Sequence, residues 1–365
     1  MSVTELVVGV VLIALAFAAG FVKGRSSRAG LATPVPGPTP RGGDTAPVSL
    51  ARSPAEPAPP ARRSRASAPR RAPAPLAPPP PVTSVRSWGY QLQDLDVKRA
   101  AASRFDLLVV DYAKDGTDDT ALKPAEIARL QTKPDGSRRL VLAYISIGEA
   151  ESYRFYWRRE WSRQRPGWLL RENPDWDQNY AVRFWDPGWQ ALLFGRPGAY
   201  LDKILAQGFD GIYLDKCDVA EDLHRRESKA VAARTDLDGD MIALVRKLAG
   251  YGRRKRPGFL VVAQNAEPLL ERAELRREID AVAKEELFFG LDAAETANDP
   301  DEIEWSRERL DLSRKDGKPV LVVEYLDDAA KIAQAAKAAH DLGYVLYVAG
   351  KDRELDSLRN DLPVA

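Results

Sequence analysis

The chain has 365 residues and a formal net charge of +1, which is unevenly distributed. Residues 24–86 carry ten arginines against two acidic residues, and residues 1–23 cancel, so residues 87–365 hold a net charge of about −7. Nucleic-acid-binding proteins concentrate positive charge on the folded domain, so this distribution argues against that class. With one cysteine and two histidines, the chain has no internal disulfide, zinc knuckle or His-rich metal site.

The N-terminal segment is strongly apolar. Residues 6–22 form a run of 17 residues without a charge, at the short end of the ~17–25 residues that a membrane-spanning helix needs. We expect residues 1–23 to be a transmembrane anchor or a signal segment, although the basic region that normally opens a signal peptide is missing. This predicts a protein of the cell envelope, membrane-anchored or secreted. The basic residues after the run leave the orientation of an anchor open.

Residues 24–86 have the composition of a linker. They contain 16 of the 27 prolines and no Phe, Trp or Tyr. Such a segment buries too little apolar surface to fold, so the sequence predicts a disordered Pro/Ala/Arg-rich linker.

Residues 87–365 read as one large globular domain in which strand-like runs alternate with helical patterns. This alternation predicts a parallel sheet covered by helices, and eight such units predict a (β/α)8 TIM barrel. An open doubly wound sheet would normally show a Gly-rich loop after its first strand, and GYQLQDLD has none. The eight predicted strands are residues 87–93, 105–112, 139–148, 209–215, 258–266, 279–287, 318–326 and 343–350.

Nearly every predicted strand ends on a polar or acidic residue. In a barrel these ends meet on one face and build the active site. Some of these residues suit helix N-caps, but acids converging on one cleft are costly unless a ligand or catalysis requires them. The strand-end residues are Gln91, Gln93, Asp111, Ser146, Glu149, Asp215, Asn265, Glu285 or Glu286, Glu324 and Tyr347.

Paired carboxylates without a His, Cys or metal motif suggest glycoside hydrolysis. One carboxyl group protonates the leaving oxygen, and the other attacks the anomeric carbon or activates a water. Asp215 and Glu285 end the fourth and sixth predicted strands, so they can face each other across a cleft. Calcium or magnesium binding by the same acids is the alternative. We expect no cofactor and no metal site.

The tryptophans are concentrated after the third predicted strand. Flat apolar side chains of this kind suit the faces of sugar rings, whereas the alternative is that they pack this segment against the barrel. We expect Trp185 to contact the substrate. The five tryptophans of the segment are Trp157, Trp161, Trp168, Trp176 and Trp185.

Several of these motifs resemble one known family. WGYQLQ, DLLVVDY, LAYISIGEAESYRFYW, WDQNYAVRFWDPGW, GFDGIYLDKCD, VVAQNAE, EELFF and VLVVEYL occur in the order found in the endo-α-1,4-polygalactosaminidase family of glycoside hydrolases, from about Ser87 to Gly350. The resemblance implies a (β/α)8 barrel that cuts galactosamine-containing exopolysaccharides outside the cytoplasm.

The resemblance also assigns roles to residues. The family's Asp in GhDGhhLD falls on Asp215, and the Glu of its E-[S/D]-L-[F/W/Y] motif falls on Glu285. We expect Asp215 to be the nucleophile or charge stabiliser and Glu285 the general acid/base, with the reverse assignment open. Lys216 should point away from Asp215, onto the other face of the strand. The expected substrate-binding residues are Gln91, Asp111, Tyr144, Glu149, Trp185, Asp218, Asn265, Glu324 and Tyr347.

The sequence therefore predicts an endo-acting hydrolase of an amino-sugar polysaccharide. The barrel is expected to be monomeric, to bind the polysaccharide and no nucleic acid, and to be attached to the membrane through its N-terminal helix. The alternative is a barrel that has lost catalysis and binds polysaccharide at the cell surface.

Overall fold

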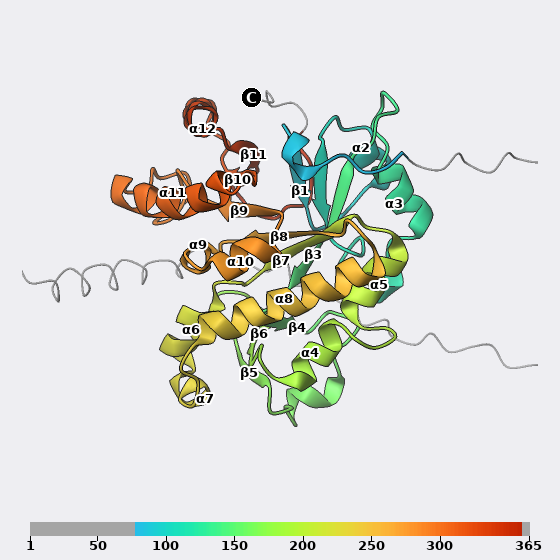
Figure 1. Ribbon diagram of the computed structural model, residues 1–365, viewed down its shortest axis with the longest axis vertical. Helices are drawn as coiled ribbons and strands as arrows, with labels where there is room; N and C mark the ends of the chain where they lie inside the picture. The colour runs from blue at the N-terminus through green and yellow to red at the C-terminus, as the bar shows by residue number, and fades with distance from the viewer. Residues whose placement is uncertain (1–76, 360–365) are drawn as a thin grey trace, which may run out of the picture. The chain divides into compact units, whose positions relative to one another are not determined.

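The computed structural model describes residues 77–359 (Figure 1). The predicted anchor, residues 1–23, and residues 24–76 of the predicted linker lie outside this part of the chain. Residues 77–86 precede the first strand and include a short 3-10 helix, η1 (Val82–Ser84). Val82 and Val85 are buried in the core. Within residues 77–359, no helix has the length and apolar character needed to cross a membrane.

Eight parallel strands form one continuous sheet in sequence order, and each corresponds to a predicted strand. The buried, Val- and Leu-rich character of these strands is typical of a parallel sheet covered on both faces. The result is a nearly closed, TIM-barrel-like sheet rather than a doubly wound one. The strands are β1 (Trp88–Gln91), β2 (Leu107–Val110), β3 (Leu140–Ser146), β7 (Gly211–Asp215), β8 (Leu260–Gln264), β9 (Ala281–Glu285), β10 (Val320–Tyr325) and β11 (Val345–Ala349).

The barrel closes between its first and last strands through a side chain. β1 and β11 are neighbours, yet in the described chain they share no ladder of paired residues. Instead the indole Nε1 of Trp88 donates to the carbonyl oxygen of Val345 at 3.0 Å. This bond satisfies one backbone acceptor at the seam.

Helices follow most strands and cover the outside of the barrel (Figure 1). Several begin where an aspartate accepts hydrogen bonds from the backbone N–H groups of the first turn. Asp186 and Asp328 do so. The helices are α2 (Val97–Ala101), α3 (Pro124–Leu130), α4 (Pro187–Leu193), α5 (Tyr200–Gln207), α6 (Val219–Arg226), α7 (Ser228–Val231), α8 (Leu237–Lys255), α9 (Glu267–Leu270), α10 (Ala273–Glu278), α11 (Pro300–Lys315) and α12 (Ala329–Leu342), with further 3-10 turns η2 (Asp118–Thr120) and η3 (Arg159–Ser162).

A small antiparallel sheet occupies the long segment between β3 and α4. It consists of β4 (Glu149–Glu151), β5 (Leu169–Glu172) and β6 (Asn179–Val182), in the order β4-β6-β5. Three tryptophans of this segment pack on one another in a chain that ends on Trp189 of α4. The ring centroids of Trp157 and Trp161, Trp161 and Trp168, and Trp168 and Trp189 lie 5.4, 5.1 and 5.3 Å apart. These four side chains therefore hold the segment together.

Aromatic side chains fill the interior of the barrel. The ring centroids of Trp88 and Tyr90 lie 5.9 Å apart, and those of Tyr90 and Tyr213 lie 5.2 Å apart. Because side chains alternate along a strand, Tyr213 points into this interior while Ile212 and Leu214 face the helices. The same alternation brings the next residue, Asp215, to the open end of the barrel.

Gly211 brings β7 close to β8. It pairs with Leu260, and a Cβ atom at position 211 would lie 2.3 Å from the carbonyl oxygen of Leu260. We expect Gly211→Ala to lower the free energy of unfolding by about 1–3 kcal/mol, because the backbones must move apart. Urea denaturation measures the change. Gly167→Ala, where a Cβ atom meets nothing within 4 Å, should leave stability unchanged, and equal effects of the two substitutions would contradict this account.

Candidate active site

A cleft of about 510 Å³ opens at the carboxyl ends of the barrel strands. It contains six residues that were predicted from the sequence for catalysis or substrate binding, and they come from different strands and the loops after them. The cleft therefore lies where active sites of barrels are found. The six residues are Asp111, Tyr144, Asp215, Asp218, Asn265 and Glu285.

Asp215 is the last residue of β7, and its carboxylate is half-buried in the cleft. The phenol of Tyr144 donates to Oδ2 at 2.6 Å. The backbone N–H of Lys216 donates to Oδ1 at 2.7 Å. Both oxygens of Asp215 therefore accept a hydrogen bond.

Glu285 ends β9 and accepts from three side chains. Asn265 Nδ2 donates to Oε2 at 2.9 Å, Gln264 Nε2 donates to the same oxygen, and the phenol of Tyr325 donates to Oε1. Burial raises the pKa of Glu285 above its ordinary value, and the nearby charge of Asp215 raises it further, against the lowering effect of these donors. Glu285 is thus the carboxyl group of the pair that is suited to hold a proton.

One amide connects the two carboxylates. Because Gln264 Nε2 lies 3.4 Å from Asp215 Oδ1 and also donates to Glu285 Oε2, these two oxygens lie within about 6 Å of each other. The prediction that Asp215 and Glu285 face each other across one cleft is therefore met by the geometry. Their catalytic roles stay predictions.

Glu286, the other acid of the EELFF motif, also lies in the cleft but is neutralised by an ion pair. Its backbone is left-handed, with a φ of 53°, and its carboxylate pairs with Arg353. Burial raises the pKa of Glu286 to about 7, although the guanidinium of Arg353 lowers it. Glu285, without an arginine partner in the described chain, is the better match for the expected role.

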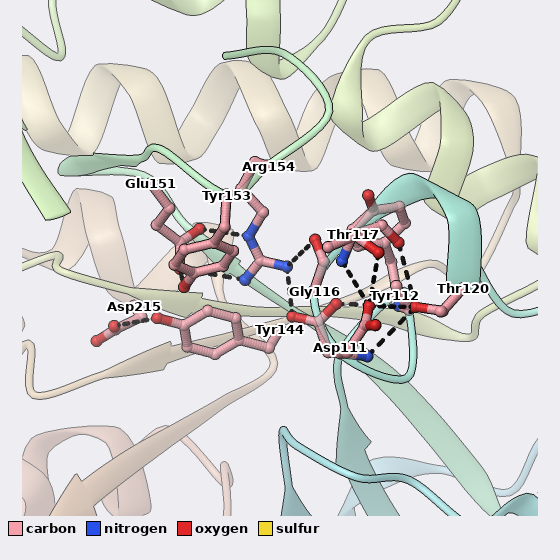
Figure 2. A network of polar contacts seen from close by, with 12 residues as sticks. Asp111, Tyr112, Gly116, Thr117, Thr120, Tyr144, Glu151, Tyr153, Arg154 and Asp215 are labelled. Carbon is pink, nitrogen blue, oxygen red and sulfur yellow. Dashed lines mark hydrogen bonds and ion pairs between the residues drawn. The ribbon is translucent and has the colours of Figure 1, made fainter. Parts of the chain in front are cut away.

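A buried ionic network borders the cleft on the side of Tyr144 (Figure 2). Arg154 Nη1 lies 2.6 Å from Asp111 Oδ2, and Arg154 Nε lies 2.7 Å from Glu151 Oε2. The phenol of Tyr153 donates to the other oxygen of Glu151. The Arg154 guanidinium also lies 6.0 Å from the centre of the Tyr144 ring. The phenol of Tyr144 in turn donates to Asp215. Burial raises the pKa of Asp111 to about 6 even beside this guanidinium.

The prediction that Lys216 points away from the cleft is wrong. Lys216 has a φ of 60°, and this left-handed conformation ends the alternation of the strand. Its side chain therefore lines the cleft, with Nζ 3.6 Å from Glu149 Oε1. Gly148 makes room for this turn, because a Cβ atom there would lie 2.4 Å from the carbonyl oxygen of Lys216.

Two of the residues predicted to bind substrate instead fix loops next to the cleft. Glu324 is completely buried, and its carboxylate accepts from the backbone N–H groups of Phe288 and Phe289 at 2.8 and 3.2 Å. It thereby holds the loop that follows Glu285. Gln91 donates to the carbonyl oxygen of Asp356 at 2.6 Å and so anchors the C-terminal segment.

Three further predicted residues also lie outside the lining of the cleft. Glu149 accepts from Asn173 at 2.8 Å and faces the ammonium group of Lys216. Trp185 packs against Phe184, with their ring centroids 5.0 Å apart. Tyr347 lies in the barrel interior with its ring 5.8 Å from that of Trp88. Strand-end position alone did not distinguish these side chains from those that reach the cleft.

Several cleft residues were missed by the sequence reasoning. Gln264 and Tyr325 lie beside predicted residues in the motifs VVAQNAE and VLVVEYL, so their position at strand ends was the available signal. Arg154 and Glu151 lie in the small sheet and the turn after it, which no strand pattern singled out. In residues 77–359, no group of three or more His, Cys, Asp or Glu side chains is arranged to hold a metal ion.

A parallel barrel with two facing carboxylates at its open end has the architecture of a glycoside hydrolase. Residues 66–361 match the model of glycoside-hydrolase family GH114, and the chain belongs to this family. The resemblance seen in the sequence motifs is thereby confirmed.

Two relatives match about three quarters of this chain. An uncharacterized protein of Methanocaldococcus jannaschii is 40% identical over 287 residues, covering 74% of this chain and 77% of that protein. An uncharacterized protein of Deinococcus radiodurans is 37% identical over 294 residues, covering 78% of this chain and 87% of that protein.

Among solved structures, the glycoside hydrolase domain of PelA from Pseudomonas aeruginosa has the same fold. It is 22% identical, with a TM-score of 0.54, and the match covers 76% of this chain and 99% of that domain. At this level of identity the likeness supports the fold alone.

The hydrogen bond from Tyr325 lowers the pKa of Glu285. We therefore expect Tyr325→Phe to raise the pKa of Glu285 further, because the ionised form loses a donor. Carboxyl ¹³C NMR titration of Glu285 measures this change. Tyr251→Phe removes a comparable bond, to Asp202 at 2.7 Å, outside the cleft and should leave the pKa of Glu285 unchanged. A lower or unaltered pKa in Tyr325→Phe would contradict the role given to this donor.

Proposed function

We propose that this chain is an endo-acting glycoside hydrolase that cleaves a galactosamine-containing exopolysaccharide with Asp215 and Glu285. The observation that carries the proposal is the position of these two carboxyl groups, which share Gln264 as a donor and line one open cleft. Membership of family GH114 supports hydrolysis of a glycosidic bond.

The two environments support different roles. Glu285, whose pKa is raised by burial and by Asp215, protonates the glycosidic oxygen as the bond to the leaving sugar breaks. Asp215, which accepts bonds from Tyr144 and from the backbone of Lys216, attacks the anomeric carbon as a carboxylate. In the second half of the reaction, ionised Glu285 takes a proton from water, and the resulting hydroxyl displaces Asp215.

The closeness of the pair favours retention of anomeric configuration. Retaining glycosidases hold their carboxyl groups roughly 5–5.5 Å apart, whereas inverting ones leave roughly 6.5–9.5 Å for a water. Oδ1 of Asp215 and Oε2 of Glu285 lie within about 6 Å of each other. Asp215 therefore acts directly on the sugar in this proposal.

The charge of the cleft supports a cationic sugar polymer. Ten acidic and three basic residues line it. A cleft of one sign attracts ligands of the opposite sign, and a partly deacetylated amino sugar carries ammonium groups. Outside the described residues, the apolar run of residues 6–22 and the Pro-rich residues 24–76 support a proposed location in the cell envelope, anchored or secreted.

Asp215→Asn and Glu285→Gln should each lower kcat on partially deacetylated polygalactosamine by about 10³-fold or more, because each removes one of two groups that act together. Release of reducing ends measures this. Asp119→Asn and Glu308→Gln are matched controls on exposed residues outside the cleft and should keep full activity. If wild type and Asp215→Asn were equally inactive while both bound the polymer, the chain would be a polysaccharide-binding barrel without catalysis.

A further inference from the structure

One tryptophan of the small sheet behaves differently from its neighbours. Trp176 is 49% exposed and lines the cleft, whereas Trp161, Trp168 and Trp189 are buried. The next exposed aromatic side chain of the cleft is Tyr153, at 38%. Two large aromatic side chains are thus left in water at the edge of a cleft that is otherwise lined mainly by polar groups.

The two aromatic residues are carried by adjacent turns that are joined to each other. The backbone N–H of Ser152 donates to the carbonyl oxygen of Gln178 at 2.8 Å, and Glu151 pairs with Asn179 in the small sheet. Tyr153 directly follows Ser152, and Trp176 lies two residues before Gln178. Tyr153 and Trp176 therefore lie on the same edge of the cleft.

The turn that bears Trp176 is held by polar bonds on both sides. Asn179 donates its backbone N–H to the carbonyl oxygen of Trp176 at 3.2 Å. The carboxylate of Asp175 pairs with Arg226 of α6 at 2.7 Å, and the side chain of Asn173 accepts from the backbone of Asp175 at 3.0 Å. A ring on such a turn loses little conformational entropy when a ligand covers it.

The side chain of Tyr153 is fixed as well. Its phenol donates to Glu151 Oε1, and the guanidinium of Arg154 lies 5.0 Å from the centre of its ring. Figure 2 shows the Tyr153 ring beside Arg154, on the side of the network away from Asp111. The ring is thus held by the same buried network that borders Tyr144.

We propose that Trp176 and Tyr153 form a separate binding subsite for a sugar ring of the polymer chain, away from the ring that is cleaved. The pyranose ring lays its apolar C–H face on the Trp176 indole, which removes both surfaces from water. The reacting carboxylates come from β7 and β9, whereas Trp176 and Tyr153, here called the platform, come from turns of the small sheet. In this proposal, a ligand that reaches the platform extends beyond the reacting ring. The identity of the polymer rests on the proposed function.

The competing interpretation is that Trp176 is an exposed surface residue without a ligand. Trp305 offers a matched comparison, since it is 36% exposed on α11 and does not line the cleft. Its ring is covered by Arg309, whose guanidinium lies 4.1 Å from the ring centre. The two tryptophans differ in their relation to the cleft, so the same substitution at each separates the two interpretations.

The test measures binding and cleavage with ligands of two lengths. We expect Trp176→Ala to raise KM for partially deacetylated polygalactosamine about tenfold, with kcat little changed, because stacking contributes to binding rather than to the chemical step. Cleavage of a short oligosaccharide that spans only the reacting bond should be unaffected. Trp176→Phe should recover part of the loss, and Trp305→Ala should match wild type on both substrates.

Calorimetry with polymer in a Glu285→Gln background separates this inference from the proposed function. A weaker affinity in Glu285→Gln/Trp176→Ala than in Glu285→Gln alone supports the platform. If wild type then cleaves nothing, only the proposed function fails. Wild-type cleavage with unchanged KM and affinity in Trp176→Ala overturns the platform. Equal losses on short and long ligands also overturn it, and the absence of both binding and cleavage in wild type overturns both proposals.

Discussion

Asp215 and Glu285 are two acidic groups that share the amide of Gln264 as a hydrogen-bond donor. The electrostatic cost of placing them so close together explains much of the site. Two such groups cannot both ionise freely in a partly buried cleft. Burial and the neighbouring charge raise the pKa of Glu285, although three side chains donate to it. Asp215 accepts from Tyr144 and from the Lys216 backbone. In the proposed mechanism, Glu285 is therefore the acid and Asp215 the nucleophile.

The same cost of burying charge applies to the guanidinium of Arg154, in the ionic network next to the reacting pair. It lies between Asp111, which follows a barrel strand, and Glu151 of the small sheet. Removing one partner of such a group leaves an uncompensated buried charge, which costs about 3–5 kcal/mol. The network therefore fixes the small sheet, and with it Tyr153, against the barrel. Glu324 acts similarly for the loop after β9, through two backbone N–H groups.

Much of this arrangement could be predicted from the sequence, because strand periodicity determines both the barrel and the end at which its polar residues gather. Asp215, Glu285 and Asn265 follow from that rule. Local backbone geometry was not predictable, so the left-handed turn at Lys216 and the inward burial of Glu324 were missed. Trp176 lines the cleft and Trp185 does not, and sequence alone could not show this because the turns of the small sheet decide which indole reaches the cleft.

The central claim is that Asp215 attacks the sugar directly while Glu285 supplies and then removes a proton. The anomeric configuration of the first-formed product tests this claim most directly, and ¹H NMR during early hydrolysis of an α-linked galactosamine oligosaccharide reads it before mutarotation. A pair whose oxygens lie within about 6 Å predicts that the α anomer forms first. Initial appearance of the β anomer would show inversion by water and would contradict the account.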